Sequence, residues 1–168
     1  MGALRLVFGA ALAALGLAAV GACGFTPLYA QPGVAGGLTR IQVVAPQGRV
    51  GYLLREDLDD SLGRDVGDAP AYRLDLALAQ SRGSHGLRAD ATAQRYELDM
   101  TVRYTLTDLS TGKVAHAGQV TSAVSYDSAD QPYAGIAARQ DTQDRMASDA
   151  AQKIELQVAA WMAGHAGG

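Results

Sequence analysis

The sequence predicts an α+β fold: a four-stranded mixed, mainly antiparallel sheet with two helices packed on one face, in the order β-α-β-β-β-α. Three observations support this prediction. Apolar and polar residues alternate through residues 96–107, as in a strand with one buried and one polar face. Residues 50–66 and 134–163 instead repeat apolar residues at helical spacing. The chain has one cysteine, so no internal disulfide can hold it and the fold must depend on an apolar core.

The first elements of the domain are predicted to be a short strand and a helix. Residues 39–45 are typical of a strand, which Pro46 and Gly48 stop. The helix over 50–66 ends before Gly67 and Pro70. Its apolar residues lie four positions apart and are Val50, Leu54, Leu58 and Leu62. Because a helical crossover joins the first strand to the sheet, we expect that strand to lie parallel to a neighbour.

Three further strands are predicted over residues 72–79, 96–107 and 114–126. The even-numbered residues of the longest one are expected to face the helices, and they are Tyr96, Leu98, Met100, Val102, Tyr104 and Leu106. Residues 110–113 supply a hairpin turn between the last two strands. The segment 80–92, which contains two glycines and two serines, is predicted to be a longer flexible loop.

One long helix is predicted over 134–163, because this segment contains no proline and its only glycine, Gly135, stands at its start. One apolar stripe runs along it and comprises Ile136, Ala147, Ala150, Ile154, Val158 and Trp161. Charged residues such as Arg139 and Asp144 flank the stripe. The stripe is therefore expected to cover the sheet and not to form a cofactor site.

The N-terminus is typical of a lipoprotein precursor. Arg5 precedes an apolar run, as in the positive region of a signal peptide. The run ends in Val20-Gly21-Ala22-Cys23, which resembles a bacterial lipobox. Cys23 would then carry a diacylglycerol and acyl chains such as palmitate, and would be the first residue of the mature protein. A plain signal peptide, or a retained membrane helix, is the alternative.

These features predict three parts of the chain: a signal peptide over 1–22, a lipidated tether over 23–38, rich in glycine, and a single domain over 39–168. The residue after Cys23 is Gly24, whereas aspartate at this position retains enterobacterial lipoproteins in the inner membrane. Gly24 therefore favours the outer membrane.

Composition and motifs exclude several classes of function. The mature chain would carry 13 basic and 17 acidic residues, a net charge of −4, which opposes nucleic-acid binding. The three histidines, His85, His116 and His165, are scattered and have no metal-ligand spacing. Asp59 and Asp60 are adjacent on a predicted helix, so they point in different directions. We therefore predict no enzyme activity, no cofactor and no metal.

Short motifs follow one another through the whole mature chain. It opens with Cys23-Gly24-Phe25-Thr26-Pro27-Leu28-Tyr29. The later motifs are Ile41-Gln42-Val43, Tyr52-Leu53-Leu54-Arg55-Glu56-Asp57-Leu58, Tyr72-Arg73-Leu74, Leu106-Thr107-Asp108-Leu109-Ser110-Thr111-Gly112, Ser125-Tyr126 and Pro132-Tyr133-Ala134. In their order and spacing, and with the lipobox, they resemble the LptE family of lipopolysaccharide-assembly lipoproteins, especially its alphaproteobacterial members.

The resemblance implies a non-enzymatic lipoprotein of the outer membrane. Such proteins sit as a plug inside the β-barrel LptD, assist its assembly and help to insert lipopolysaccharide into the outer leaflet. The implied fold is again a four-stranded sheet with two helices on one face. Two alternatives stay open at this point. One is a lipid-tethered binding module of another envelope complex, and the other is a small-ligand carrier with a cavity between helices and sheet.

The family's lipopolysaccharide contacts are attributed to basic residues near loops. In this chain Arg82 and Arg88 lie within the predicted loop 80–92, and Arg95 follows it. Arginine forms bidentate contacts with phosphate groups such as those of lipid A. We therefore expect weak lipopolysaccharide binding at this loop, and the alternative is a solvated loop whose arginines only keep the protein soluble.

Overall fold

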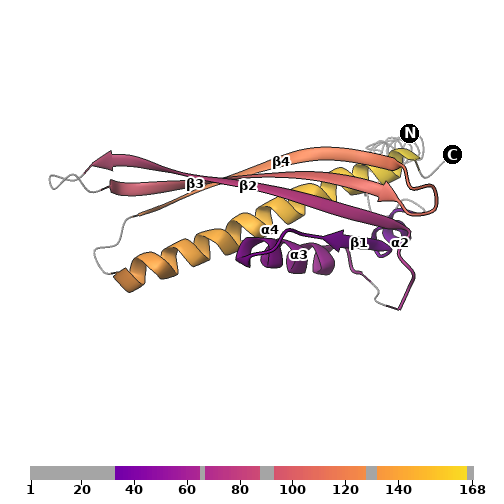
Figure 1. Ribbon diagram of the computed structural model, residues 1–168, viewed down its shortest axis with the longest axis horizontal. Helices are drawn as coiled ribbons and strands as arrows, with labels where there is room; N and C mark the ends of the chain where they lie inside the picture. Colours follow the sequence, from indigo (N-terminus) through magenta and orange to yellow (C-terminus); the bar gives the residue numbers. More distant parts are fainter. Residues whose placement is uncertain (1–32, 65–66, 88–92, 128–131, 166–168) are drawn as a thin grey trace, which may run out of the picture.

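The computed structural model describes residues 33–64, 67–87, 93–127 and 132–165. In chain order the described elements are α2 (Val34–Leu38), β1 (Ile41–Val44), α3 (Arg49–Ser61), β2 (Tyr72–Leu87), β3 (Ala93–Asp108), β4 (Val114–Asp127) and α4 (Pro132–His165) (Figure 1). The four strands form one mixed sheet, which confirms the predicted α+β class. In the described residues no helix is both long and apolar enough to cross a membrane.

The strands lie in sequence order, β1-β2-β3-β4, and their pairing follows the prediction. β1 runs parallel to β2, with Val43 opposite Leu74. β2 and β3 are antiparallel, and Leu74 lies opposite Leu106. β4 is antiparallel to β3, and their register shifts once, between Leu106 and Thr107. The crossover through α3 thus places β1 parallel to its neighbour, as expected for a helix that joins two strands.

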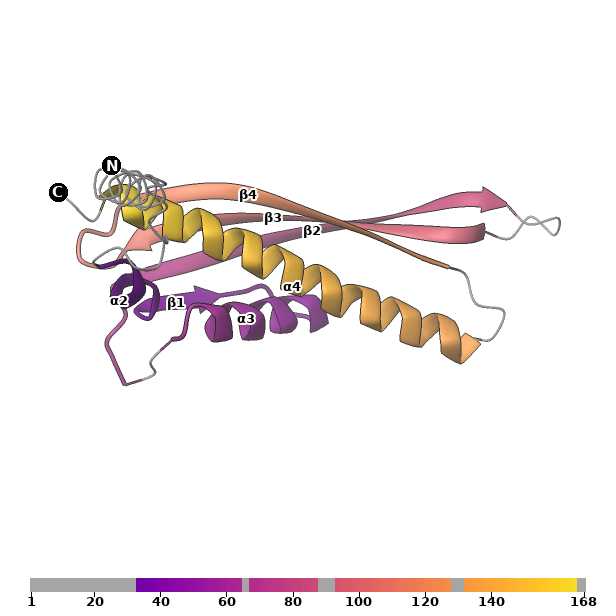
Figure 2. The same ribbon diagram turned by 180° about the vertical axis from the view of Figure 1, so that it is seen from behind.

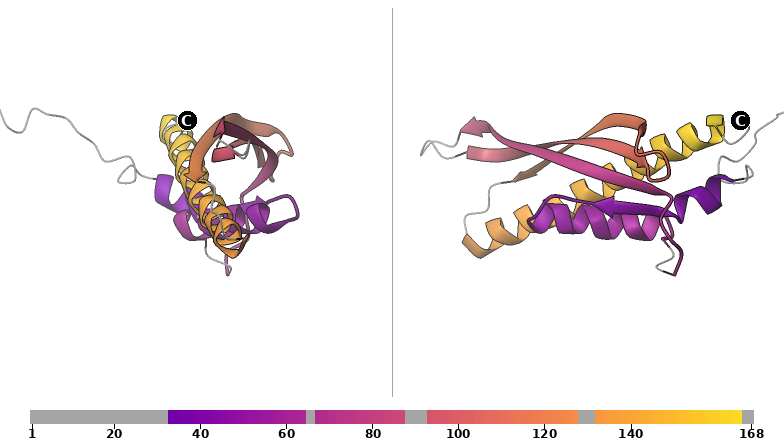
Figure 3. Two further views of the ribbon diagram at one scale, coloured as in Figure 1. Left: turned by 90° about the vertical axis from the view of Figure 1, so that its left-hand side faces the viewer. Right: turned by 45° about the vertical axis from the view of Figure 1, so that its right-hand side comes forward.

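Helices α3 and α4 lie on one face of the sheet, as Figures 2 and 3 show from two sides. The core lies between these helices and the sheet. On β3 it contains Leu98, Met100, Val102, Tyr104 and Leu106. These are the even-numbered residues that the alternation predicted, so the sequence-based register is confirmed. The helices contribute further buried residues, including Leu54, Leu58, Met146, Ile154 and Val158. Tyr96, the sixth predicted residue, is partly buried.

The last residues of the predicted tether, 23–38, belong to the folded domain. Residues Val34–Leu38 form helix α2, and Val34 and Leu38 are buried in the core. A side chain at Gly37 would lie 2.9 Å from the sulfur of Met162, so α2 packs closely on the end of α4. Two apolar residues a helical turn apart can cover the end of the core, which composition alone did not indicate. Residues 23–32 lie outside the described residues.

The predicted loop over 80–92 is instead largely strand. β2 continues to Leu87, and β3 already begins at Ala93. The pairing is regular from Tyr72 opposite Asp108 to His85 opposite Arg95. Main-chain hydrogen bonds to a partner strand do not depend on the side chains, so glycine and serine did not stop the ladder.

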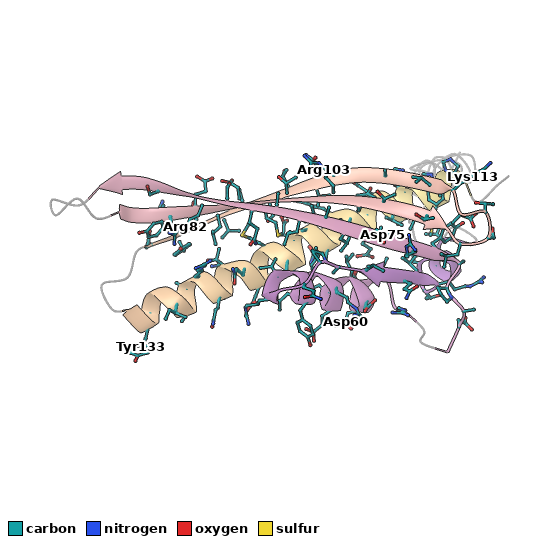
Figure 4. The ribbon with its side chains drawn as sticks, in the orientation of Figure 1. Asp60, Asp75, Arg82, Arg103, Lys113 and Tyr133 are labelled. Carbon is teal, nitrogen blue, oxygen red and sulfur yellow. The ribbon has the colours of Figure 1, made fainter. Side chains whose placement is uncertain are left out.

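The predicted apolar stripe of α4 is correct except at its first residue. Ala147, Ala150, Ile154 and Val158 are fully buried and Trp161 is partly buried, but Ile136 is 56% exposed. The first two turns of α4 extend past the residues that pack on the core, and Figure 4 shows Tyr133 projecting from them away from the sheet.

Candidate binding surfaces

Two surfaces are available for binding. The first is the face of the sheet turned away from the helices, which we call the outer face. The second is the part of the β2–β3 hairpin that extends beyond β1 and α3, residues 79–87 and 93–99, which we call the distal arm (Figure 1).

The outer face is mostly small and polar. Figure 4 shows Arg103 pointing from it, away from the helices. Its odd-numbered residues include Arg73, Ala77, Ala79, Asp99, Thr101, Arg103, Thr105, Gln119, Thr121 and Ala123. Charges on this face have close partners: Arg73 Nε lies 2.8 Å from Asp75 Oδ2, and Arg103 Nε donates to Gln119 Oε1 at 3.1 Å. The outer face is therefore suited to hydrogen-bonded contact with a polar surface.

The distal arm carries a cation and two aromatic rings on the helix side of the sheet. The guanidinium carbon of Arg82 lies 5.0 Å from the ring centroid of Tyr96. Tyr96 stacks in turn on Tyr126 of β4, with ring centroids 5.5 Å apart. A guanidinium at this distance is attracted by the negative face of the ring, so the contact orients Arg82. An oriented, exposed cation beside apolar rings can bind a group that is both anionic and lipid-like.

The structure does not bring the predicted arginines onto one surface. Arg82 is on the even, helix-side face, whereas Arg95 is on the outer face. Arg95 Nε lies 2.9 Å from Asp127 Oδ1, the residue opposite it on β4. Cys23 and Arg88 lie outside the described residues. The Tyr96–Tyr126 pair was missed by sequence reasoning, because counting outward from the turn at 110–113 places Tyr96 opposite Asp127, and the register shift between Leu106 and Thr107 changes that pairing.

A third group of polar and aromatic residues lies at the opposite end of the sheet. The Tyr104 hydroxyl donates to Gln157 Oε1 at 2.7 Å and lies 3.1 Å from His116 Nε2. Trp161 stacks between the rings of His116 and His165, at 5.8 and 4.8 Å. Burial, and secondly the nearby His165, lower the pKa of His116.

This group connects α4 to the sheet. Burial raises the pKa of Tyr104, which therefore remains a protonated hydrogen-bond donor. His165 Nδ1 lies 2.7 Å from the carbonyl oxygen of Trp161, one turn earlier, so it interacts with the end of the helix. Among the residues that the structure describes, no cluster of histidine, cysteine or carboxylate side chains could hold a metal ion.

Solved structures of several bacterial lipoproteins share this fold. The chain is 49% identical to a candidate lipoprotein from Caulobacter crescentus CB15, with a TM-score of 0.68 over 79% of this chain and 97% of that one. Rare lipoprotein B from Shewanella oneidensis is 19% identical, with a TM-score of 0.55 over 71% and 92% of the two chains. Lipoprotein B from Nitrosomonas europaea is 18% identical, with a TM-score of 0.56 over 73% and 83%. The last two similarities concern the fold alone.

A search of curated proteins found no match. The family model described as "LptE: Lipopolysaccharide-assembly" matches residues 38–158, from the end of α2 to the last buried turns of α4. This match includes the whole sheet and α3. The chain therefore belongs to the LptE lipopolysaccharide-assembly family.

Proposed function

We propose that this protein is a lipid-anchored component of the outer membrane that sits inside the β-barrel LptD, helps the barrel to assemble, and assists the insertion of lipopolysaccharide into the outer leaflet. The observation that carries this proposal is the match of residues 38–158 to the lipopolysaccharide-assembly family. The role is one of binding and needs no catalysis, cofactor or metal.

The outer face supports the barrel contact. The lumen of a large outer-membrane barrel is polar, and the outer face offers small and polar side chains, with Arg73 paired to Asp75 and Arg103 hydrogen-bonded to Gln119. Contact between two such surfaces is wet and hydrogen-bonded, with few apolar anchors. The domain would thus face the periplasm and the barrel lumen.

Lipidation at Cys23 is the second part of the proposal, and residues 1–22 would be removed as the signal peptide. Several acyl chains on one residue anchor a protein stably, whereas a single chain binds a membrane only marginally. Mass spectrometry of the mature protein tests this directly. We expect an acylated N-terminal Cys23, and an unmodified cysteine with residues 1–22 still attached would refute it.

The third part concerns the lipopolysaccharide contact. Of the three predicted arginines, Arg82 has the best support, because Tyr96 orients its guanidinium beside apolar rings. Arg88 stays in the proposal, and Arg95 contributes less because Asp127 lies against it. We expect Arg82→Glu to weaken lipopolysaccharide binding and added salt to weaken binding by the parent. Tyr96→Leu, which keeps the apolar volume but removes the ring, should weaken binding less.

Two experiments test the whole role. Co-expression with LptD should yield a one-to-one complex that survives mild detergent and protects this chain from protease. Depletion of the protein should reduce surface lipopolysaccharide and change the oxidation state of LptD. Separate elution of the two proteins, with normal surface lipopolysaccharide after depletion, would favour the alternative of a binding module for another envelope complex.

The small-ligand carrier has less support. A carrier needs unfilled space between its helices and its sheet. The large side chains of Tyr104, Met100, Leu106, Met146 and Ile154 are fully buried at that interface. They fill the centre of the sandwich where such a ligand would have to lie.

A further inference from the structure

The edge of β2 is only partly paired. β1 pairs with its first four residues, from Ile41 opposite Tyr72 to Val44 opposite Asp75. β2 then continues to Leu87, and in the described part of the chain no other strand lies on that side of it. Figure 1 shows the distal arm running on beyond β1 and α3. From about Leu78 onward, β2 is thus an edge strand of the described sheet.

The main-chain groups that point to this open edge can be identified. The amide of Leu109 donates to the carbonyl of Ala71 at 3.0 Å, so this carbonyl faces β3. The amide of Tyr72 instead donates to the carbonyl of Arg40 at 3.3 Å, on the β1 side. Along a strand, the main-chain amides and carbonyls of successive residues point alternately to one neighbouring strand and to the other. The register of β2 with β3 has no shift as far as His85. The amides and carbonyls of residues 78, 80, 82 and 84 therefore point away from β3.

The opposite edge of the sheet is different. β4 packs against α4, and Lys153 Nζ of that helix donates to the main-chain carbonyl of Thr121 at 2.9 Å. A side chain of the protein itself thus satisfies a main-chain acceptor of β4. No comparable side-chain bond to the main chain is found at residues 78–84 among the described parts of the molecule.

The open edge also lacks the usual protection against pairing. Edge strands are commonly protected by proline, bulges or several charges. Residues 78–84 contain no proline and no register shift, and Arg82 is their only charged residue. On the outer face this stretch presents only Ala79, Ser81 and Gly83. Small side chains there leave room for the side chains of an incoming strand.

We propose that residues 78–84 of β2 bind an extended segment of a partner protein by strand addition, and that this segment places a carboxylate beside Arg82. Main-chain bonds to the edge supply affinity, and side chains at alternate positions supply specificity. Leu78 is a partly buried apolar neighbour for the segment, and Arg82 is an exposed cation that Tyr96 orients. The edge therefore fits a segment with an apolar residue and an acidic residue on the same face. The proposal does not depend on the lipopolysaccharide role.

The test uses the full chain in mild detergent and a fluorescein-labelled peptide of alternating valine and threonine with one central glutamate. A second peptide has lysine in place of that glutamate. Gln80→Pro removes an amide that points to the open edge, and its ring obstructs a neighbouring strand, yet it leaves the β3 ladder intact. Gln80→Ala is the matched control. Circular dichroism checks that both variants remain folded.

Fluorescence anisotropy should show saturable binding of the glutamate peptide to the parent and to Gln80→Ala. Gln80→Pro should weaken it by about fivefold or more, as expected for a lost hydrogen bond and a blocked edge. The lysine peptide should bind the parent less tightly, and Arg82→Glu should reverse the order of the two peptides. Hydrogen exchange should slow on binding at the amides of residues 78, 80, 82 and 84.

Three results would overturn the proposal. The first is equal affinity for the parent and a folded Gln80→Pro. The second is the absence of saturable binding up to about 1 mM peptide, which corresponds to only about −4 kcal/mol. The third is a concentration-dependent dimer of the parent that Gln80→Pro abolishes, because a second copy of this chain would then occupy the edge. Since Gln80→Pro leaves Arg82 in place, lipopolysaccharide binding should be unchanged in this variant.

Discussion

The two ends of the sheet are stabilised in different ways. The end that β1, α3 and α4 cover contains fully buried residues from every layer, such as Ile41, Leu54, Leu74 and Ile154. The distal arm has a strand ladder, the Tyr96–Tyr126 stack and an exposed ion pair, and along its β2 strand residues 79–82 and 84 are all exposed. Apolar burial thus fixes the first end, whereas in the arm Leu98 is the one residue in the described core and main-chain pairing fixes the rest. The surfaces proposed for binding accordingly lie where burial is least needed.

Two leucines on the same face of β2 provide the strongest test of this difference. Leu74 is fully buried, and Leu78, four residues later, is partly buried at the base of the arm. Leu74→Ala should lower the free energy of unfolding by about 2–5 kcal/mol, since it loses transfer energy and leaves a cavity. Leu78→Ala should lower it by about 1 kcal/mol. Urea unfolding at an unchanged m-value measures both, and equal losses would mean that the arm belongs to the same core.

Two glycines extend the comparison to close packing. An added Cβ at Gly118 would lie 2.5 Å from the Tyr104 hydroxyl oxygen, whereas nothing lies within 4 Å of one at Gly135. Gly118→Ala should therefore displace the Tyr104 ring and destabilise the protein by about 1–3 kcal/mol. Gly135→Ala, in an exposed turn of α4, should instead stabilise it by up to about 1 kcal/mol, because alanine is the better helix former. A destabilising Gly135→Ala would show that the first turns of α4 have a packing partner.

A pH dependence is expected at the covered end of the sheet. His116 has a lowered pKa, first because of burial and then because of His165, so the unfolded state takes up a proton before the folded state does. Stability from this group is present above about pH 6.5 and is lost as the pH falls through the window between the unfolded and the folded pKa. We expect the parent to lose more stability than His116→Gln between about pH 7.5 and 5, because only the parent takes up a proton at this position on unfolding. Parallel curves for the two proteins would contradict this.

The parts of the fold that follow from side-chain patterning could be predicted. The alternation through Leu98, Met100 and Val102 identified the buried face of β3, and the spacing of Leu54 and Leu58 identified the buried face of α3. The length of the distal arm could not be predicted, because its glycines and serines are held by a backbone ladder that leaves no periodicity. For the same reason Arg82 was expected within a loop and Arg95 just after it, at one binding site, although strand geometry sends them to opposite faces. The exposure of Ile136 could not be predicted either, because it depends on how far the core reaches along α4 and not on the residue pattern of the helix itself.

The smallest effect concerns the ion pairs at the two ends. Arg95 and Asp127 cross from β3 to β4 in the arm at 2.9 Å, with 59% and 76% of their side chains exposed. Arg49 and Asp144 join α3 to α4 at 2.7 Å, with 48% of each exposed. Water screens both pairs, so double-mutant cycles should give coupling energies of about 0.2–1 kcal/mol for each, and less at high salt. A clearly larger coupling for Arg95 and Asp127 would mean that ion pairing, and not the strand ladder, stabilises the arm. In that case Arg95→Ala should speed amide exchange at Glu97 and Asp99, whereas Arg49→Ala should leave those amides unchanged.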